Sequence, residues 1–264
     1  MTPILVVGVG HMGGALVDGW LRTGAFAASD LILNDPKPGH GADTAVAAGA
    51  KLNPPDVVLK ATKTVLLAVR PQIWREVAAA LAPKLAASAP VVSVAAGIKH
   101  ADLVAAFPGH AVARVMPTTA VAVGKGAVSI FAPDAPARAA AHALFDPVAT
   151  TVDLGGEALM DAAVAVSGSA PAYLYALIEA LAAAGEAEGL AAEDAKALVR
   201  ATVIGAAALL DETGADPAQL RREVASPGGT TEAALKALLA EDGLGPLMVR
   251  TVQAAARRSR ELGR

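Results

Sequence analysis

The chain has 264 residues, a formal net charge of −3 and no cysteine. Hydrophobic residues make up 54% of it and charged residues 18%, a composition that is typical of a globular protein and excludes a disordered one. The charge gives no reason to expect a nucleic-acid partner. The absence of cysteine excludes disulfides, thiolate metal sites and a thiol nucleophile, and it fits a reducing compartment, so we expect a cytoplasmic protein.

The first part of the chain alternates short apolar strands with helical stretches. Continuous apolar runs predict strands at residues 4–10, 31–35, 64–69, 90–96, 111–117 and 127–133. Runs without polar alternation are typical of strands that are buried on both faces of a parallel sheet. Because helical stretches separate the early strands, we expect repeated β-α-β units and therefore an α/β fold with a doubly wound parallel sheet.

The pattern changes after residue 153. From Glu157 onward almost every segment is compatible with helix, and proline and glycine interrupt it near residues 167–172, 213–219, 226–231 and 242–246. We therefore predict a dinucleotide-binding domain at residues 1–156 and an all-helical domain at residues 157–264. The longest apolar-rich run, residues 201–210, is far shorter than the ~20 residues that span a bilayer, so no membrane partner is expected.

Glycines 8, 10 and 13 form a G-x-G-x-x-G pattern between the first strand and the first helix. Gly8 would allow the tight turn, Gly10 would let the backbone approach a pyrophosphate, and Gly13 would let the helix pack close to the strand. The helix N-terminus offers free N–H groups and partial positive charge to phosphates. The alternative is a turn that needs its glycines for packing alone.

The second predicted strand ends at Asn34 and Asp35, where a ribose-reading residue is expected, about twenty residues beyond the glycine loop. Asp35 could accept a hydrogen bond from a 2′-hydroxyl and would repel a 2′-phosphate, which favours NADH. Asn34 and Lys37 could instead serve a phosphate, and Asp35 could be a turn residue before Pro36. These residues therefore predict NADPH or NADH as the cofactor.

Several segments together resemble the pyrroline-5-carboxylate reductases, which catalyse the last step of proline biosynthesis. The resemblance covers nearly the whole chain and is carried by residues 8–16, 66–72, 93–98, 114–127, 165–190 and 220–235. Its most specific part is "SGSAPAY" at residues 167–173, followed about sixty residues later by "SPGGTT" at residues 226–231. The family usually has lysine at Arg70, asparagine at Thr118, proline at Ala120 and glycine at Ala170.

The resemblance implies a Rossmann-type sheet domain followed by a helical dimerisation domain, with the active site completed near the dimer interface. It implies a homodimer or a higher homo-oligomer of dimers. Residues 197–212, which are apolar on nearly every face, fit such an interface. The implied reaction is hydride transfer from NAD(P)H to the imine carbon of pyrroline-5-carboxylate. Thr118 and Ala120 leave open another cyclic imine acid as the substrate.

The glycine loop, the strand ends and the resemblance together define the expected cofactor-binding residues. They are Gly8, Gly10, His11, Met12, Gly13, Asn34, Asp35, Ala68, Val69, Arg70, Pro71, Ala96, Gly97, Met116 and Pro117. Arg70 could equally be a solvated surface residue. His40, His100, His110 and His142 show no metal-ligand spacing, so no metal is predicted.

The "SPGGTT" segment is the predicted anchor for the substrate. Two adjacent glycines let backbone N–H groups converge on an anion, and Thr230 or Thr231 is expected to begin the next helix. The expected substrate-binding residues are Ser169, Ser226, Gly228, Gly229, Thr230 and Thr231. By resemblance, Thr231 hydrogen-bonds the imine nitrogen and is the catalytic residue. The alternatives are an ordinary Ser-Pro turn with a threonine cap and, for Ser169, a simple helix cap.

The sequence argues against two other functions. A β-hydroxyacid dehydrogenase needs an acid/base lysine in the helix after its glycine-serine segment, and this chain has no lysine between Lys125 and Lys196. A non-catalytic dinucleotide-binding module is expected to lose the "SPGGTT" segment, which is intact here. Both are therefore disfavoured.

Overall fold

The computed structural model describes residues 1–263, apart from the side chain of His40. It consists of two compact units, the first comprising Met1–Gly168 together with the end of the chain from Ala255, the second Ser169–Ala254. Residues 157–168 belong to the first unit because they pack against its sheet. The division at residues 156 and 157 that the sequence suggests stays a prediction.

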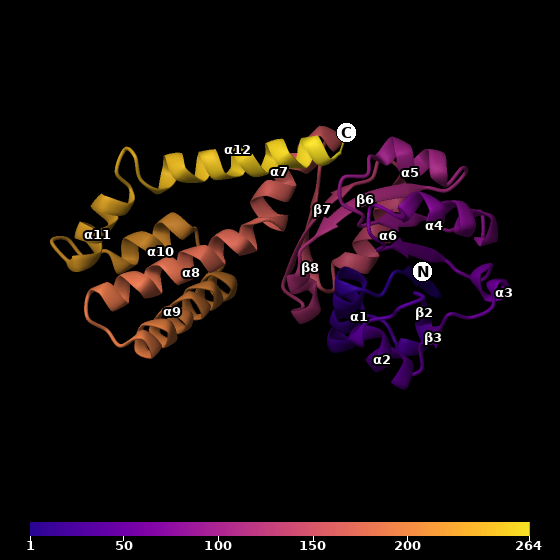
Figure 1. Ribbon diagram of the computed structural model, residues 1–264, viewed down its shortest axis with the longest axis horizontal. Helices are drawn as coiled ribbons and strands as arrows, with labels where there is room; N and C mark the ends of the chain where they lie inside the picture. Colours follow the sequence, from indigo (N-terminus) through magenta and orange to yellow (C-terminus); the bar gives the residue numbers. More distant parts are fainter. Residues whose placement is uncertain (264) are drawn as a thin grey trace. The chain divides into compact units, whose positions relative to one another are not determined.

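The first unit, on the right in Figure 1, is built on a sheet. This sheet has eight strands in the order β3-β2-β1-β4-β5-β6-β7-β8. The strands are β1 (Ile4–Val7), β2 (Leu31–Asn34), β3 (Lys51–Leu52), β4 (Thr64–Leu67), β5 (Val91–Ser93), β6 (Val112–Pro117), β7 (Gly126–Phe131) and β8 (Ala149–Asp153). Neighbouring strands are parallel except for β6 and β7, which are antiparallel. The predicted doubly wound parallel sheet is confirmed, with the one difference that β7 is antiparallel to β6.

Two of these strands were not predicted from the sequence. β3 and β8 are the two edges of the sheet, and most of their residues are exposed or only half-buried. An edge strand has one neighbour and needs no continuous apolar run, so the search for such runs passes over it. Residues 118–125 connect β6 to β7 and are too few for a parallel crossover, which needs a dozen or more residues. β7 is therefore antiparallel to β6.

The central strands are buried on both faces, as their composition predicts. In β1, Ile4 and Val6 join the core that contains Trp20, whereas Leu5 and Val7 join the core that contains Trp74. The first core lies under α1 (His11–Thr23), α2 (His40–Ala47) and α6 (Ala135–Phe145), and the second under α3 (Asp56–Leu59), α4 (Trp74–Leu81) and α5 (His100–Ala106). Helices therefore cover both faces of the sheet.

Short segments complete the first unit. They are η1 (Ala28–Asp30), η2 (Ala82–Lys84), η3 (Thr119–Val123), η4 (Glu157–Leu159), α7 (Met160–Ala163) and the π-helical η5 (Val164–Gly168). The final helix, α12 (Leu244–Leu262), begins in the second unit and ends in the first. Among the described residues, none after Asp153 lies in a strand, as the sequence predicts.

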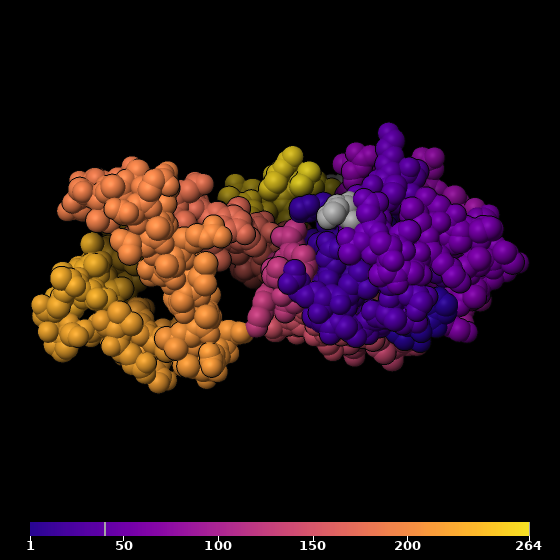
Figure 2. Space-filling view, turned by 90° about the horizontal axis from the view of Figure 1, so that it is seen from below, coloured from indigo at the N-terminus to yellow at the C-terminus, as the bar shows by residue number. Residues whose placement is uncertain are grey.

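The second unit consists of α8 (Ala170–Ala187), α9 (Ala192–Thr213), α10 (Pro217–Val224), α11 (Thr230–Leu238) and the first part of α12. Figure 2 shows its salmon-to-gold atoms loosely gathered, with a gap among them. Of its described hydrophobic residues, only Ala182, Ala195 and Val199 are buried. Large side chains of α8 such as Leu174 and Leu177 are 55% and 51% exposed. The single subunit thus leaves an extensive apolar surface uncovered.

One helical run among the described residues, Glu157–Ala187, is long and apolar enough to cross a membrane by length and composition alone, and 6% of its apolar window is buried. Such a run is weak evidence for a membrane protein, because helices that pack against other protein pass the same test.

Candidate functional site: a glycine loop and a helix N-terminus

The carboxyl ends of β1, β4, β5 and β6 lie at one edge of the sheet, because these strands are adjacent and parallel. The chain continues from β1 to β2 on one side and returns to β4 on the other, so the strand order reverses beside β1. In open α/β sheets, ligands bind at such a switch point. The predicted cofactor-binding residues lie at or just after the ends of these strands and of β2.

Gly8 and Gly13 are required by close packing. Gly8 has a φ of +91°, and a Cβ atom there would lie 2.7 Å from the carbonyl oxygen of Ala68. A Cβ atom on Gly13 would collide with the carbonyl oxygen of Gly8 and would lie 3.3 Å from the Cβ of Ala68. Ala68 thus leaves no room for a Cβ at either glycine, and the Val69 side chain adds to the crowding at Gly8. Packing alone accounts for these two positions.

Gly10 requires a different explanation. It is exposed, and no atom of the described residues lies within 4 Å of the position that its Cβ would occupy. Gly10 is the N-cap of α1, no described side chain caps this helix end, and the first turn of α1 carries no acidic residue. The first-turn amides, which include those of His11 and Met12, have no partner within the helix and lie at its positive end. This cradle fits a pyrophosphate group.

Asp35 lies immediately after β2 and its carboxylate is already hydrogen-bonded. Its Oδ2 accepts a hydrogen bond from the backbone N–H of Val9 at 2.7 Å, and its Oδ1 accepts one from the N–H of Lys37 at 2.7 Å. Asn34, the last residue of β2, accepts a bond from the N–H of Gly8 at its carbonyl oxygen. The end of β2 is therefore tied directly to the glycine loop.

Asn53 is a residue that the sequence analysis missed. Its side-chain Oδ1 accepts a hydrogen bond from the N–H of Asp35 at 2.9 Å, and its Nδ2 donates to the carbonyl oxygen of Asp35 at 2.9 Å. Asn53 has a φ of 44°, in the left-handed region that asparagine tolerates better than most residues. An asparagine before two prolines was the available sequence signal for such a turn.

The remaining predicted cofactor residues follow their strands as expected. Arg70 is exposed and Pro71 half-buried after β4, whereas Ala96 and Gly97 follow β5, and Gly97 has a φ of +75°. Met116 and Pro117 are the last residues of β6. Their roles in cofactor binding stay predictions.

Thr118, where the family usually has asparagine, has a structural role in this chain. Its Oγ1 accepts a hydrogen bond from the N–H of Ala127 at 3.0 Å, and its own N–H donates to the carbonyl oxygen of Ala127. Ala120 lies in η3, within the same connection between β6 and β7. The Thr118 side chain thus closes this connection against the first residues of β7.

In the second unit, the "SPGGTT" segment forms the turn that leads into α11. Gly228 has a φ of +72°, Gly229 is the N-cap, and α11 begins at Thr230, as the sequence predicts. The carbonyl oxygen of Ser226 accepts a hydrogen bond from the N–H of Gly229 at 3.0 Å. Thr231 lies in the first turn and is half-buried.

Glu232 is a second residue that the sequence analysis missed. Its Oε2 accepts a hydrogen bond from the N–H of Gly228 at 2.6 Å, and its Oε1 lies 3.0 Å from the Nζ of Lys236. The Gly228 N–H and then Lys236 lower the pKa of Glu232. The Gly228 amide, which was predicted to face a substrate anion, is therefore engaged by Glu232 here. A glutamate at the third position of a helix is the sequence signal for this contact.

Ser169 occupies the N-cap position of α8, but its side chain makes no capping hydrogen bond. The π-helical η5 precedes it, and within η5 the Ser167 hydroxyl donates to the carbonyl oxygen of Ala163 at 2.7 Å. Single π-helical turns within α-helices are frequent at functional sites. The simple capping alternative for Ser169 thus lacks its hydrogen bond, and its role in substrate binding stays a prediction.

Within the described part of the chain, no three histidine, aspartate or glutamate side chains are grouped so that they could hold a metal ion. His100 and His110 hydrogen-bond to the carbonyl oxygens of Val112 and Ala89. The side chain of His40 lies outside the described residues.

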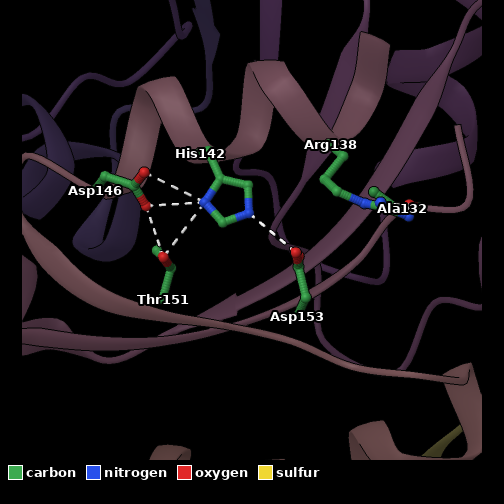
Figure 3. Close-up of polar contacts among 6 residues, drawn as sticks. All are labelled: Ala132, Arg138, His142, Asp146, Thr151 and Asp153. Carbon is green, nitrogen blue, oxygen red and sulfur yellow. Dashed lines mark hydrogen bonds and ion pairs between the residues drawn. The ribbon is translucent and has the colours of Figure 1, made fainter. Parts of the chain in front are cut away.

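His142 of α6 lies between two carboxylates (Figure 3). Its Nδ1 is 3.0 Å from Oδ1 of Asp146, and its Nε2 is 3.2 Å from Oδ2 of Asp153 on β8. The Thr151 hydroxyl donates to Asp146 at 2.6 Å. The hydrogen bond with Asp146 and the second carboxylate raise the pKa of His142. This cluster ties the edge strand to the helix that covers it.

Comparison with known proteins gives matches over both parts of the chain. A family model for pyrroline-5-carboxylate reductase dimerisation matches residues 157–262, and one for coenzyme F420-dependent NADP oxidoreductases matches residues 3–97. The Pseudomonas aeruginosa pyrroline-5-carboxylate reductase is 38% identical over 99% of this chain and 97% of its own length. The Synechocystis reductase is 37% identical over 98% of this chain and 97% of its own.

Solved structures agree with these matches. A pyrroline-5-carboxylate reductase from Coxiella burnetii superposes with a TM-score of 0.91 and 29% identity, over 100% of this chain and 99% of that one. The Plasmodium falciparum enzyme with NADP bound gives a TM-score of 0.82 and 25% identity, over 100% of this chain and 98% of that one. The resemblance and the two-part fold are thus confirmed: the chain belongs to the pyrroline-5-carboxylate reductase family.

Proposed function

We propose that this protein reduces L-1-pyrroline-5-carboxylate to L-proline with NAD(P)H. The proposal agrees with the name of the relatives that match nearly the whole chain, pyrroline-5-carboxylate reductase. The observation that carries the proposal is the open cradle at Gly10, because a reductase of this kind must bind a dinucleotide and packing does not explain this glycine. When bound, the reduced nicotinamide supplies a hydride to the imine carbon, and the imine nitrogen takes a proton to become a secondary amine.

The first unit binds and orients the cofactor in this mechanism. The uncapped amides at the start of α1 hold the pyrophosphate. Ala68 and Val69, which contact the glycine loop, and Met116 and Pro117, at the end of β6, are proposed to position the nicotinamide. Positioning of this kind supplies much of the rate acceleration, because an imine or its iminium form is already electrophilic.

The second unit holds the substrate. We assign the substrate carboxylate to the positive N-terminal end of α11, where the Thr230 amide begins the helix, because the Gly229 amide already donates to the carbonyl oxygen of Ser226. The Thr231 hydroxyl, in the first turn, is assigned to hydrogen-bond the imine nitrogen. Ser169 and Ser226 are further proposed contacts. A different cyclic imine acid is the alternative substrate, since Thr118 and Ala120 depart from the family pattern.

The family model for dimerisation supports a homo-oligomer, and we propose that its unit is a homodimer. α8 and α9 enclose a groove of about 810 Å³ whose lining includes Tyr175, Ile178, Val203 and Ile204. The apolar run Glu157–Ala187 overlaps the matched segment, so contact with a second subunit explains it better than a membrane does. The proposed subunit contact argues against a membrane partner, and the net charge of −3 argues against a nucleic-acid partner. We therefore propose a cytoplasmic enzyme.

The proposed reaction is tested by the loss of absorbance at 340 nm when pyrroline-5-carboxylate is added to protein and NADH or NADPH. A six-membered cyclic imine acid serves as the comparison substrate. Rapid turnover of the five-membered ring is the expected result. Cofactor binding with turnover of the six-membered ring alone would reject the assigned substrate.

The role of Thr231 is tested in the same assay with Thr231→Ala and Thr231→Ser. We expect Thr231→Ala to lower kcat about a hundredfold with little change in the dissociation constant of the cofactor, and Thr231→Ser to restore most of the loss. Thr251→Ala is the matched control, because the Thr251 hydroxyl donates to the carbonyl oxygen of Leu247 within α12. A loss of cofactor affinity in Thr231→Ala would contradict the assignment of Thr231 to the substrate.

A further inference from the structure

We infer that this chain selects NADH over NADPH and that Asp35 is the residue responsible. The inference rests on the proposed function in one respect only, namely that the glycine loop binds a nicotinamide dinucleotide. The two cofactors differ at a single place, the 2′ position of the adenosine ribose, which carries a hydroxyl in NADH and a phosphate in NADPH. The selecting residue must therefore face that ribose.

Asp35 lies where the ribose is expected. It follows the last residue of β2, and β2 is the direct neighbour of β1 in the sheet. A dinucleotide whose pyrophosphate rests on the start of α1 places its adenosine ribose at the end of the second strand. The 2.7 Å bond from the Val9 N–H brings the Asp35 carboxylate against the glycine loop itself.

The carboxylate is held in place. Each of its two oxygens accepts one backbone N–H, from Val9 and from Lys37, both at 2.7 Å. Its own backbone is held at both polar groups by the side chain of Asn53. Moving the side chain away to admit a phosphate would break two charge-assisted hydrogen bonds. Asp35 therefore acts as a fixed negative charge.

The turn that follows Asp35 is also anchored. The N–H of Gly39 donates to the carbonyl oxygen of Val9 at 3.0 Å, so both backbone groups of Val9 are bonded to this turn. Pro36 and Pro38 flank Lys37 and restrict its backbone. Segment 34–41 contains no arginine, the residue that commonly accommodates a 2′-phosphate. A fixed carboxylate in an anchored turn favours the ribose diol and repels the phosphate.

The oxygens of Asp35 retain the capacity to bind the ribose. An ionised carboxylate offers about four acceptor positions, and the two backbone N–H groups use two of them. The 2′-hydroxyl of NADH can donate to a remaining position. The 2′-phosphate of NADPH is mostly doubly ionised at neutral pH, so it meets repulsion from Asp35 and rarely has a proton to donate to it.

The test measures binding of NADH and of NADPH to the purified full chain, without imine, by isothermal titration calorimetry. We expect NADH to bind at least tenfold more tightly than NADPH. Asp35→Asn keeps a side-chain acceptor for the Val9 N–H but removes the charge, so we expect the NADPH affinity to rise at least tenfold. Asp35→Ser should in addition weaken NADH binding. Asp134→Asn, an exposed aspartate before α6, is the matched control and should leave the ratio unchanged.

Tighter binding of NADPH by the unchanged protein, or an unchanged ratio in Asp35→Asn, would overturn the inference. Thermal unfolding of each variant separates a change of specificity from a loss of the fold. The binding measurement also separates the inference from the proposed reaction. Reduction of pyrroline-5-carboxylate with a preference for NADPH would uphold the reaction and reject the role of Asp35, whereas selective NADH binding without reduction would do the reverse.

Discussion

The guanidinium of Arg114 donates to the carboxylate of Glu157 at 2.7 Å, and the Arg114 side chain is only 8% exposed. The same Oε1 atom accepts a hydrogen bond from the N–H of His100 at 2.7 Å. One carboxylate oxygen thus joins β6, the start of α5 and η4. These contacts attach the segment after the sheet to the inner strand β6 and to the start of α5.

Removal of this carboxylate should destabilise the protein. We expect Glu157→Ala to lower the free energy of unfolding by about 2 kcal/mol, less than the ~3–5 kcal/mol of a fully buried pair because the Glu157 side chain is 27% exposed. Glu157→Gln keeps an acceptor for both N–H donors and should lose less. Urea unfolding gives these values, with Glu188→Ala at the exposed end of α8 as the control. Equal losses in Glu157→Ala and Glu188→Ala would contradict the structural role.

Substitutions at Gly10 and Gly13 of the glycine loop should differ in their effect on stability, although both should weaken cofactor binding. Gly10→Ala places its methyl group in open space, so we expect an unchanged melting temperature but at least a tenfold weaker binding of NADH. Gly13→Ala meets the carbonyl oxygen of Gly8 and should lower both stability and binding. Gly155→Ala, also in open space, is the control. Unchanged NADH binding by Gly10→Ala would contradict the placement of the pyrophosphate at the start of α1.

The cluster at His142 predicts a dependence of stability on pH. Asp146 and Asp153 raise the pKa of His142 in the folded state, above its ordinary value near 6.5. The protonated ring therefore stabilises the fold fully below pH ~6.5, and this stabilisation is lost as the pH rises through the raised pKa. Because the side chain is 32% exposed, we expect less than about 1 kcal/mol.

Urea unfolding from pH 5.5 to 8.5 measures this effect. His142→Gln should flatten the pH dependence in that range, and Asp153→Asn should weaken it in part, because the bond to Asp146 remains. If the unchanged protein and His142→Gln lost stability in parallel as the pH rose, the cluster would not be its source.

The groove between α8 and α9 predicts the subunit contact. Ile204 lines this groove and is 59% exposed in the single chain. Burial of a charge in a subunit interface is unfavourable, so Ile204→Glu should shift the protein toward the monomer. Light scattering after size-exclusion chromatography measures the mass, with Val57→Glu on α3, 73% exposed, as the control. An unchanged mass for Ile204→Glu would place the interface elsewhere.

Much of the first unit could be predicted because its physics is local. Strands buried on both faces require continuous apolar runs, so β1 and β4 are evident in the sequence, as are the glycine loop between β1 and α1 and the start of α11 at Thr230. The edge strands β3 and β8 lack that requirement and were missed. The short connection at residues 118–125 would have indicated the antiparallel direction of β7, had its length been used.

The amino-acid sequence by itself determined the fold class, the family and the positions of the glycines and threonines that the proposed chemistry uses. Only the tertiary structure decided what Asp35, Arg114 and Glu232 contact. Asp35 meets Val9, 26 residues away, and Arg114 meets Glu157, 43 residues away. Such pairings depend on how strands and helices pack, whereas a strand or helix boundary depends on neighbouring residues. Even the short-range bond of Glu232 depends on the left-handed turn at Gly228, which sets the direction of the amide that it binds.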